Sequence, residues 1–280
     1  MSNPYNPREY WQKRLSAQKL SIASVGYLGL GLEYNTWLYR KRFSVLSHSL
    51  NRLNINITGK SVLDVGVGSG AYIPFWQKHG VDSVTGLDIT TISVTTLQLR
   101  YPGYRFFQGD VSTEIPSINK SAFDIVTAFD VLFHIVDDYE FSWSISNLAK
   151  YIKPGGWLVI SDGFCPRSWG PIYHEYHRSY DFYQSELEKN FLTIVQLEPI
   201  FFTMMTPLCG SQALDRLVAL VTRIVCKLGS KRESAWVNHI IGAVLFNADT
   251  ILNNFSSTGP GLKYLFVHKK IDIEDKTIRI

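Results

Sequence analysis

Cysteine is scarce in this sequence, and its spacing argues against two kinds of cross-link. The 280 residues include three cysteines, Cys165, Cys209 and Cys226, an odd number without a C-x-x-C pair. A disulfide framework needs paired cysteines, and a structural zinc site usually draws on closely spaced ones. We therefore expect neither, which is typical of a protein of the reducing cytoplasm.

Long apolar runs and dense blocks of positive charge are also missing. The best candidate for a membrane span, LVALVTRIVCKL, is interrupted by Arg223 and is shorter than the roughly 18 residues that cross a bilayer. The opening MSNPYNPREYWQKR lacks the charged and apolar regions of a secretory signal. A net charge of +4 without a clustered Lys/Arg block does not indicate a nucleic-acid partner. We expect a soluble or peripheral cytoplasmic protein.

Residues 1–58 have helical periodicity and little strand character. Apolar side chains recur at spacings of three and four over residues 8–18 and 35–53. Glycines punctuate the aromatic stretch VGYLGLGLEY between them, which indicates a loop. We interpret this region as an N-terminal helical cap that precedes the next domain.

From Lys60 the pattern changes to short apolar strands that alternate with helices. Strands are predicted over residues 61–66, 83–88, 104–110, 123–130 and 157–162, with helices over 72–80, 90–101 and 138–152. The PGG of residues 154–156 is predicted to turn the chain into the fifth strand. Elements that alternate at these lengths indicate βαβ units and a parallel sheet covered on both faces.

The region after Asp162 is less regular. We predict a lid loop over residues 163–182, a helix over 184–191, a strand over 192–202 and a last strand over 262–270. The insertion between the last two, about residues 204–259, is apolar and mostly helical over 211–228 and 234–255. Three interpretations of it stay open: a pocket roof, a dimer contact, or a surface for membrane headgroups. The last would use five basic residues: Arg216, Arg223, Lys227, Lys231 and Arg232.

The stretch VLDVGVGSGAY, residues 62–72, covers the first predicted strand and the turn after it. Gly66, Gly68 and Gly70 remove Cβ atoms where the backbone must turn tightly and approach a ligand. Their spacing suits either a dinucleotide or S-adenosylmethionine. Asp88, at the end of the second strand, suits both as well, because an acid there accepts hydrogen bonds from ribose hydroxyls. These residues predict a nucleotide-type ligand without choosing between the two.

Asp64 separates the two ligands by charge. It precedes the first glycine by two residues, at the end of the strand and close to the N-terminus of the next helix. A pyrophosphate placed there would meet a carboxylate of like charge, which is costly away from water. The ammonium and sulfonium groups of S-adenosylmethionine would instead be attracted. The charge argument therefore favours S-adenosylmethionine over a nicotinamide cofactor.

Three further motifs, FQGDVS, AFDVLFHI and YIKPGGWLVI, follow in order. With the glycine loop they resemble the class I S-adenosylmethionine-dependent methyltransferases over about residues 60–162. The resemblance implies an α/β, Rossmann-like seven-stranded mixed sheet, mostly parallel with the last strand antiparallel, helices on both faces, and a methyltransferase domain over 59–280. It also implies S-adenosylmethionine as cofactor, with S-adenosylhomocysteine as its product. The implied cofactor contacts are Asp64, Gly66, Gly68, Gly70, Asp88, Ile89, Asp110, Val111, Phe129, Asp130 and Val131.

Histidines and tyrosines outside the cofactor motifs are candidates for the acceptor site. His134, after the fourth strand, and His174, in the lid loop, are candidate general bases for an acceptor hydroxyl. The alternatives are that His134 packs or orients its loop and that His174 belongs to a solvated lid. Tyr27, Tyr173 and His177 are candidate substrate contacts. A spacing of three would place both lid histidines on one helical face, but two histidines are too few to predict a metal site.

Aromatic side chains of the cap are expected to form the other wall of the site. In related enzymes an N-terminal segment folds over the cofactor and excludes water, which suits transfer chemistry. The alternative is that these side chains only pack helices on the sheet. The residues concerned are Tyr10, Trp11, Tyr27, Tyr34 and Trp37.

Together these features predict an S-adenosylmethionine-dependent methyltransferase with a small-molecule acceptor. The preferred acceptor atom is a hydroxyl oxygen of a natural product, sugar or cyclic metabolite. Two alternatives stay open: methylation of a lipid or lipid-linked glycan at a membrane surface, and a non-catalytic cofactor-binding or scaffold protein. The apolar insertion is also compatible with a homodimer.

Overall fold

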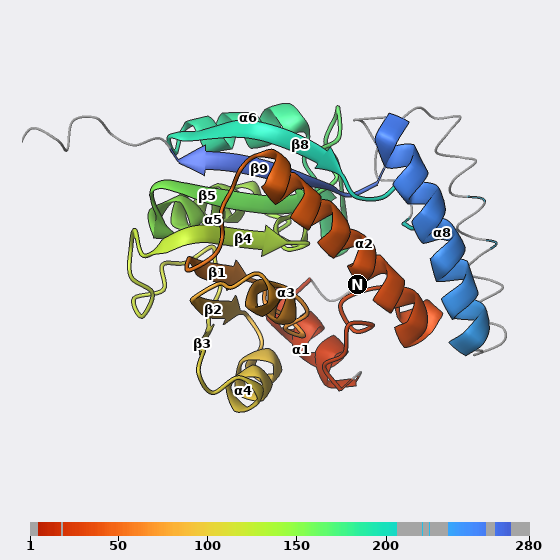
Figure 1. The fold of residues 1–280 in the computed structure, drawn as a ribbon. Coiled ribbons are helices and arrows are strands. Elements are labelled where there is room, and N and C mark those ends of the chain that lie inside the picture. Colours follow the sequence, from red (N-terminus) through yellow and green to blue (C-terminus); the bar gives the residue numbers. More distant parts are fainter. Residues whose placement is uncertain are drawn as a thin grey trace, which may run out of the picture.

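A seven-stranded sheet forms the centre of the molecule. The computed structural model describes residues 5–17, 19–205, 220, 224, 235–255 and 261–269. The strand order is β3-β2-β1-β4-β5-β9-β8 (Figure 1). The strands are β1 Ser61–Val65, β2 Ser83–Asp88, β3 Arg105–Gln108, β4 Phe123–Phe129, β5 Ile152–Asp162, β8 Leu192–Pro199 and β9 Lys263–Lys269.

Strand directions confirm the expected mixed sheet. The ladders that join β1 to β2, β1 to β4, β2 to β3 and β4 to β5 are parallel. The last strand, β9, runs antiparallel to both β5 and β8, and it lies between them. Strand order reverses between β1 and β4, and in such sheets ligands bind beyond the carboxyl ends of the strands at this point.

Helices cover both faces of the sheet, as predicted. Alternate residues of each strand point to opposite faces, so Val62 belongs to one buried cluster and Leu63 to the other. The first cluster includes Leu46 of α2 and Trp76 of α3, and the second includes Phe141 of α5. The helices are α1 Pro7–Ala17, α2 Gly31–Arg52, α3 Ile73–Lys78, α4 Thr91–Arg100, α5 Asp138–Tyr151, α6 Tyr180–Glu188 and α8 Ala235–Phe255.

Three local predictions were wrong. The PGG of residues 154–156 lies inside β5, where the ladder to β4 shifts register between Phe123 and Ile125, so these residues bulge from the strand instead of forming a separate turn. Residues 169–177 form a two-stranded hairpin, β6 Trp169–Ile172 and β7 Glu175–His177, and not a helical face. The cap loop is shorter than expected, because a 3-10 turn at Leu28–Leu30 leads directly into α2.

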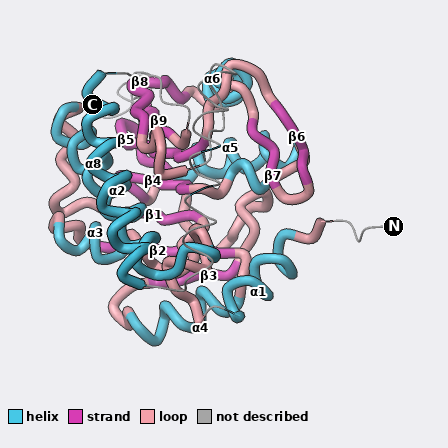
Figure 2. Tube along the Cα trace, turned by 90° about the vertical axis from the view of Figure 1, so that its right-hand side faces the viewer, coloured by secondary structure: helices cyan, strands magenta, loops and turns pink. Residues whose placement is uncertain are grey.

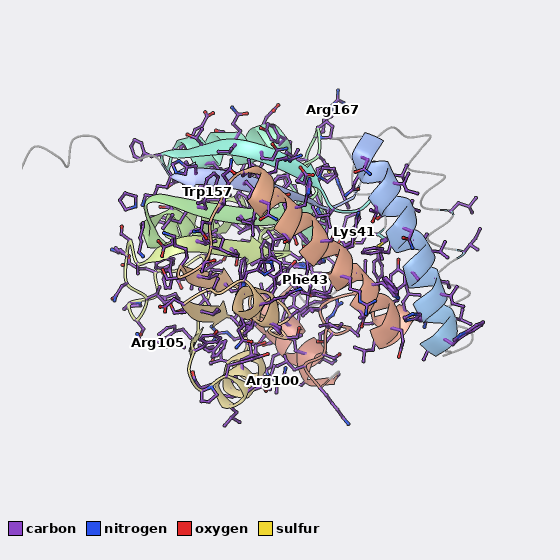
Figure 3. All side chains as sticks on the ribbon, in the orientation of Figure 1. Lys41, Phe43, Arg100, Arg105, Trp157 and Arg167 are labelled. Atoms are coloured by element: carbon purple, nitrogen blue, oxygen red, sulfur yellow. The ribbon has the colours of Figure 1, made fainter. Side chains whose placement is uncertain are left out.

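Helix α2 lies between the sheet and helix α8. Figures 1 and 2 show α2 and α8 running side by side on one flank, and Figure 3 shows Lys41 of α2 in the gap between them. The Lys41 ammonium donates to the hydroxyl of Thr250 at 3.2 Å. On its sheet side, α2 stacks Phe43 on Phe75 of α3. The cap is therefore packed into the fold and is not a separate unit.

Helix α8 is the longest described part of the predicted insertion. It is long and apolar enough to cross a membrane by length and composition, with a mean hydropathy of 1.2 over its most apolar window, of which 17% is buried. The membrane-span candidate chosen from the sequence, in 211–228, lies outside the described residues apart from 220 and 224. The five basic residues Arg216, Arg223, Lys227, Lys231 and Arg232 lie outside them as well.

Asp249 attaches α8 to the end of the chain segment that follows β8. Its carboxylate accepts hydrogen bonds from the backbone amides of Phe202, Thr203 and Met204 and from the Thr203 hydroxyl. The group is buried, and burial raises its pKa above the usual range. Removing the carboxylate leaves several buried N–H donors without acceptors.

We expect Asp249→Ala to lower the free energy of unfolding by roughly 2–4 kcal/mol, because unsatisfied buried donors cost about 1–3 kcal/mol each and partly relax. Urea unfolding followed by tryptophan fluorescence measures the change. Asp82→Ala, at an exposed turn, is the matched control and should stay within about 0.5 kcal/mol of the wild type. Equal destabilisation by the two substitutions would contradict the assigned role of Asp249.

Candidate active site

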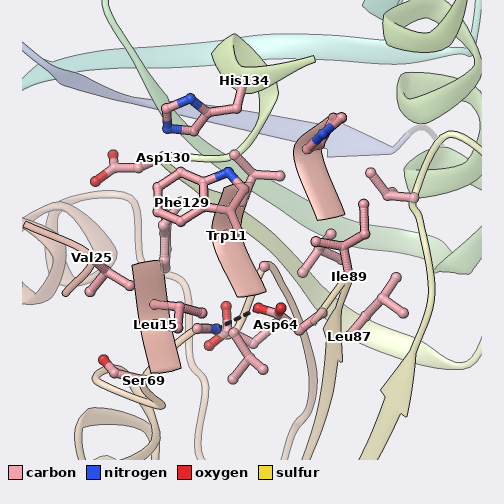
Figure 4. A pocket seen from close by; sticks show the side chains of 18 of the residues that line it. Trp11, Leu15, Val25, Asp64, Ser69, Leu87, Ile89, Phe129, Asp130 and His134 are labelled. Atoms are coloured by element: carbon pink, nitrogen blue, oxygen red, sulfur yellow. Dashed lines mark hydrogen bonds between the residues drawn. The ribbon is translucent and has the colours of Figure 1, made fainter. Parts of the chain in front are cut away.

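A cavity lies beyond the carboxyl ends of β1, β2 and β4, at the reversal of strand order. It is lined by the glycine loop, by residues that follow β2, β3 and β4, and by residues of the N-terminal cap. Figure 4 shows Trp11, His134 and Asp130 near one another, with Asp64 deeper in the cavity. The position at the reversal of strand order suits a nucleotide-type ligand.

The glycine loop forms the floor of the cavity. Gly66 has a φ of +70°, and a Cβ there would lie 2.2 Å from Val131 Cγ2, so only glycine fits. The Gly68 amide donates to the Asp88 carboxylate at 2.8 Å. Gly70 does not line the cavity; its φ is +75°, and a Cβ there would meet Leu97 of α4 at 2.6 Å. Gly70 therefore serves the turn and its packing, and the expectation of a ligand contact does not match its position.

Asp88 is buried and holds this loop in place. One carboxylate oxygen accepts from Gly68, and the other accepts from the amide and the hydroxyl of Thr90 at the start of α4. We predicted hydrogen bonds to ribose hydroxyls, and Asp88 does line the cavity. Both carboxylate oxygens of Asp88 already accept hydrogen bonds from the chain, and the ribose hydroxyls of a ligand in the cavity would donate to the same oxygens. Asp88 therefore both shapes the loop and is accessible to a ligand.

Asp64 is the acid that the sequence singled out, and the structure places it in the cavity floor. It is 3% exposed and accepts a hydrogen bond from the Thr127 hydroxyl at 2.9 Å. Burial raises its pKa to about 7, with the nearby Asp88 carboxylate raising it further and the Thr127 hydrogen bond opposing the change. A cationic ligand would favour the ionised form.

The charge around the cavity suits a cation. Five acidic residues line it: Asp64, Asp88, Asp110, Asp130 and Glu140. The Ser69 hydroxyl, on the glycine loop, is buried and has no hydrogen-bond partner among the described residues, so a polar ligand atom has a group to meet there. This chemistry fits S-adenosylmethionine, which brings positive charge, better than a dinucleotide pyrophosphate.

The remaining cofactor candidates line the cavity on either side of this floor. Ile89, Asp110 and Val111 follow β2 and β3, and Phe129 and Val131 flank the end of β4. One oxygen of Asp110 accepts from the amide and hydroxyl of Ser112. Its other oxygen has no partner in the described part of the chain and remains available to a donor.

Asp130 has an unusual backbone and a buried cationic partner. Its φ is +58°, in the left-handed region that non-glycine residues seldom adopt. Its carboxylate pairs with the Arg42 guanidinium at 2.6 Å and accepts from the Ser161 hydroxyl at 2.6 Å. The sequence analysis missed Arg42, which belongs to no motif and lies 88 positions before Asp130.

The cap contributes to the cavity, although only some of the aromatic residues expected there reach it. Trp11 lines the cavity, and Leu15, Val25 and Tyr39 of the cap do so as well. Trp37 instead contacts His239 of α8, at 3.4 Å from the indole nitrogen. Three further aromatic candidates do not line the cavity: Tyr10, Tyr27 and Tyr34. Tyr72, directly after the glycine loop, also lines the cavity and was missed.

His134 lies on the cavity wall with one ring nitrogen already engaged. Its Nδ1 is 2.8 Å from the carbonyl oxygen of His174, so Nδ1 carries the proton and Nε2 has a free lone pair. Burial lowers its pKa to about 4, while the hydrogen bond to His174 partly opposes this change. The ring is therefore neutral near pH 7 and is able to accept a proton.

The other lid candidates lie outside the cavity lining. His174, Tyr173 and His177 belong to the β6–β7 hairpin, which supports His134 from behind. Tyr173 is at the exposed turn with a φ of +49°, and His177 is buried beside Asp162. Their contact with substrate therefore stays a prediction. In the described ranges no three His, Cys, Asp or Glu side chains form a metal-ion group.

Comparisons with known proteins connect this site to one family. Residues 63–160 match the family model "Methyltransferase domain". The ubiquinone biosynthesis O-methyltransferase of Paracidovorax citrulli is 28% identical over 142 residues, 46% of this chain and 57% of that protein. Its counterpart from Chromobacterium violaceum is 33% identical over 144 residues, 46% of this chain and 58% of that protein. The chain thus matches somewhat more than half the length of these two relatives.

Solved structures show the same fold at low identity. Magnesium protoporphyrin IX methyltransferase from Synechocystis PCC 6803, with bound S-adenosylmethionine, has a TM-score of 0.56 and 15% identity, over 94% of this chain and 95% of that one. The [4+2]-cyclase SpnF has a TM-score of 0.53 and 16% identity, over 82% and 81%. At these identities the likeness concerns the fold alone.

The raised pKa of Asp64 predicts a pH-dependent affinity for S-adenosylmethionine. The carboxylate form predominates only above about pH 7, so a proton competes with the cationic ligand below it. We expect affinity to fall by up to about tenfold from pH 7 to pH 6, because one proton is displaced on binding.

Isothermal calorimetry from pH 6 to pH 8 measures this dependence. Asp64→Asn keeps an acceptor for Thr127 but cannot ionise, so it should bind weakly and lose this pH dependence. NAD serves as the control ligand and should bind poorly. An unchanged pH dependence in Asp64→Asn would assign the titration to another group.

Proposed function

We propose that this chain, whose residues 63–160 match a methyltransferase domain, is a class I S-adenosylmethionine-dependent methyltransferase that methylates a hydroxyl oxygen of a small-molecule acceptor with His134 as general base. The observation that carries the proposal is a neutral histidine on the cavity wall whose Nε2 is free to take a proton. The relatives named O-methyltransferases support oxygen as the acceptor atom.

Bound S-adenosylmethionine supplies an activated methyl group for an in-line displacement. The task of the protein is to position the acceptor and to remove the proton of its hydroxyl group. His134 Nε2 takes that proton as the oxygen–methyl bond forms, while Nδ1–H stays on the His174 carbonyl and fixes the orientation of the ring. The acids of the cavity floor attract the positively charged donor.

Exclusion of water from the cavity favours this chemistry. Pro7, Trp11 and Leu15 of α1 line the cavity from the cap side, opposite the glycine loop. The Arg14 guanidinium donates to the carbonyls of Ser24 and Gly26, which ties α1 to the following loop. Charges in such a covered site interact more strongly than in water. Helix α1 therefore acts as a cover under this proposal.

The walls favour a ring-bearing or largely apolar acceptor. Trp11, Tyr39, Tyr72 and Phe129 line the cavity, and aromatic surfaces bind flat apolar groups well. Asp130 adds a hydrogen-bond acceptor on the same wall, which suits a second hydroxyl group on the ligand. A hydroxylated aromatic compound combines both properties.

We expect His134→Ala to lower kcat by about 10²–10⁴-fold, because it removes the general base, and to leave S-adenosylmethionine affinity within about twofold. The measurement is S-adenosylhomocysteine release with a panel of phenols and catechols, alongside calorimetry for the donor. His239→Ala, on α8 and outside the cavity lining, is the matched control. Unchanged turnover in His134→Ala rules out the base. Transfer to amines without transfer to hydroxyls rules out oxygen as the acceptor atom.

A lipid-like acceptor at a membrane surface is the second candidate function. Its support is helix α8, which carries no Lys, Arg or Glu and exposes Trp236 and Val244 to 72% and 61%. Asp249, the acidic residue on this helix, faces the interior. The names of the relatives refer to ubiquinone biosynthesis, which is compatible with a hydrophobic acceptor.

This second candidate predicts that the protein floats with vesicles. With zwitterionic vesicles we expect a bound fraction that falls severalfold in Trp236→Ser/Val244→Ser, because the exposed apolar area is lost. Trp143→Ser, an exposed tryptophan on α5, is the matched control and should float like the wild type. Absence of flotation by the wild type would leave the soluble acceptor as the function.

A further inference from the structure

The β6–β7 hairpin places a row of ionisable side chains behind His134. Asp162, at the end of β5, begins the row, and His177, Glu175 and His174 continue it toward the cavity wall. The function proposed above uses only His134 and the carbonyl of His174. The charges of the other side chains in the row determine whether these side chains stabilise or destabilise a proton on His134.

The inner end of the row is an ion pair. The Asp162 carboxylate accepts from the Tyr183 hydroxyl, the Gly163 amide and His177 Nδ1, so three donors surround it. The His177 ring stacks between Phe133, at 4.9 Å, and Trp169, at 4.5 Å. Burial disfavours the charged ring, but the carboxylates of Asp162 and Glu175 outweigh burial and raise its pKa to about 9. His177 is therefore an imidazolium near pH 7.

Glu175 lies between this imidazolium and His174. One carboxylate oxygen is 3.8 Å from His177 Nε2, and the other is 3.4 Å from His174 Nε2. The neighbouring histidines lower the pKa of Glu175, so it is ionised. Asp162 and Glu175 carry two negative charges and His177 carries one positive charge. The Lys263 ammonium, which donates to the Gly163 carbonyl beside Asp162, adds a positive charge at the inner end of the row, and Glu175 is the carboxylate that lies next to His174.

His134, on the cavity wall, is stacked on His174, which contacts Glu175. The rings of His134 and His174 stack at 5.3 Å between centroids with an interplanar angle of 8°. Glu175 favours the protonated form of His134, whereas Arg14 of α1 and a protonated His174 oppose it. Tyr10, also of α1, faces His174 with its hydroxyl at 3.3 Å from Nε2. A proton taken up by His134 would lie across the stacked His174 ring from the Glu175 carboxylate.

We propose that Glu175 is a positioning residue that stabilises the imidazolium formed on His134 when it removes the acceptor proton. The proposal rests on the proposed role of His134 as base. It extends that role, because adjacent residues of one hairpin then supply two functions: the His174 carbonyl orients the ring, and Glu175 compensates its charge. This is the arrangement of a base and its orienting acid, with the acid acting across a stacked ring.

Titration of His134 tests the proposal without any acceptor. In the full-length protein with S-adenosylhomocysteine, ¹⁵N NMR should give a His134 midpoint near pH 4, and Glu175→Gln should lower it by about one unit. Glu188→Gln, an exposed glutamate on α6, is the matched control and should leave it unchanged. Glu175→Asp should restore part of the shift. An unchanged midpoint in Glu175→Gln would overturn the proposal.

Turnover separates this proposal from the base hypothesis itself. With a simple phenol we expect Glu175→Gln to lower kcat by about tenfold at unchanged KM, because a one-unit weaker base removes the proton less well. With a nitrophenol, which is already largely ionised, the loss should shrink to within about twofold. An equal loss on both phenols would indicate a merely structural role and would overturn the proposal. Full activity of His134→Ala would instead overturn the proposed function, while the titration would still report on Glu175.

Discussion

The hydrogen bond from the Gly68 amide to the Asp88 carboxylate is the contact on which the cavity depends. The glycine loop leaves the sheet at the end of β1, where the amides of Gly66 and Val67 still donate to the Leu87 carbonyl of β2, whereas the Gly68 amide needs a side-chain acceptor. Asp88 at the end of β2 supplies the missing acceptor and joins the loop to the start of α4 through Thr90. Asp88 holds the glycine loop from one side. The other side of the loop faces the cavity.

This arrangement buries two carboxylates, which is unfavourable, but the buried carboxylates also determine which kind of ligand binds. Asp64 and Asp88 are both buried with raised pKa values, because desolvation disfavours their ionised forms. A ligand that brings positive charge relieves this penalty, whereas a phosphate increases it. Asp88 therefore holds the loop, and both acids select the chemical class of the donor, so glycine spacing alone is uninformative about the cofactor.

Two long-range contacts connect the outer elements to this centre. The Arg42–Asp130 ion pair ties α2 to the end of β4, and an ion pair this far from water needs close geometry to offset desolvation. The hydrogen bond between His134 and the His174 carbonyl ties the hairpin to the segment that follows β4. The cap and the hairpin thus contact residues that line the cavity. Their packing therefore also determines the shape of the site.

Local features of the sequence determined the sheet, the glycine turn and the acidic floor around Asp64. These follow from interactions within a few residues: alternation of apolar side chains along strands, and turns that only glycine adopts. The hairpin at 169–177 was misjudged, because a spacing of three between His174 and His177 suits a helix as well as a strand–turn–strand segment. Only the tertiary structure decided which side chains face the cavity. Arg42 and Asp130 are 88 positions apart, and contacts at such separation depend on how whole elements pack, which no local pattern encodes.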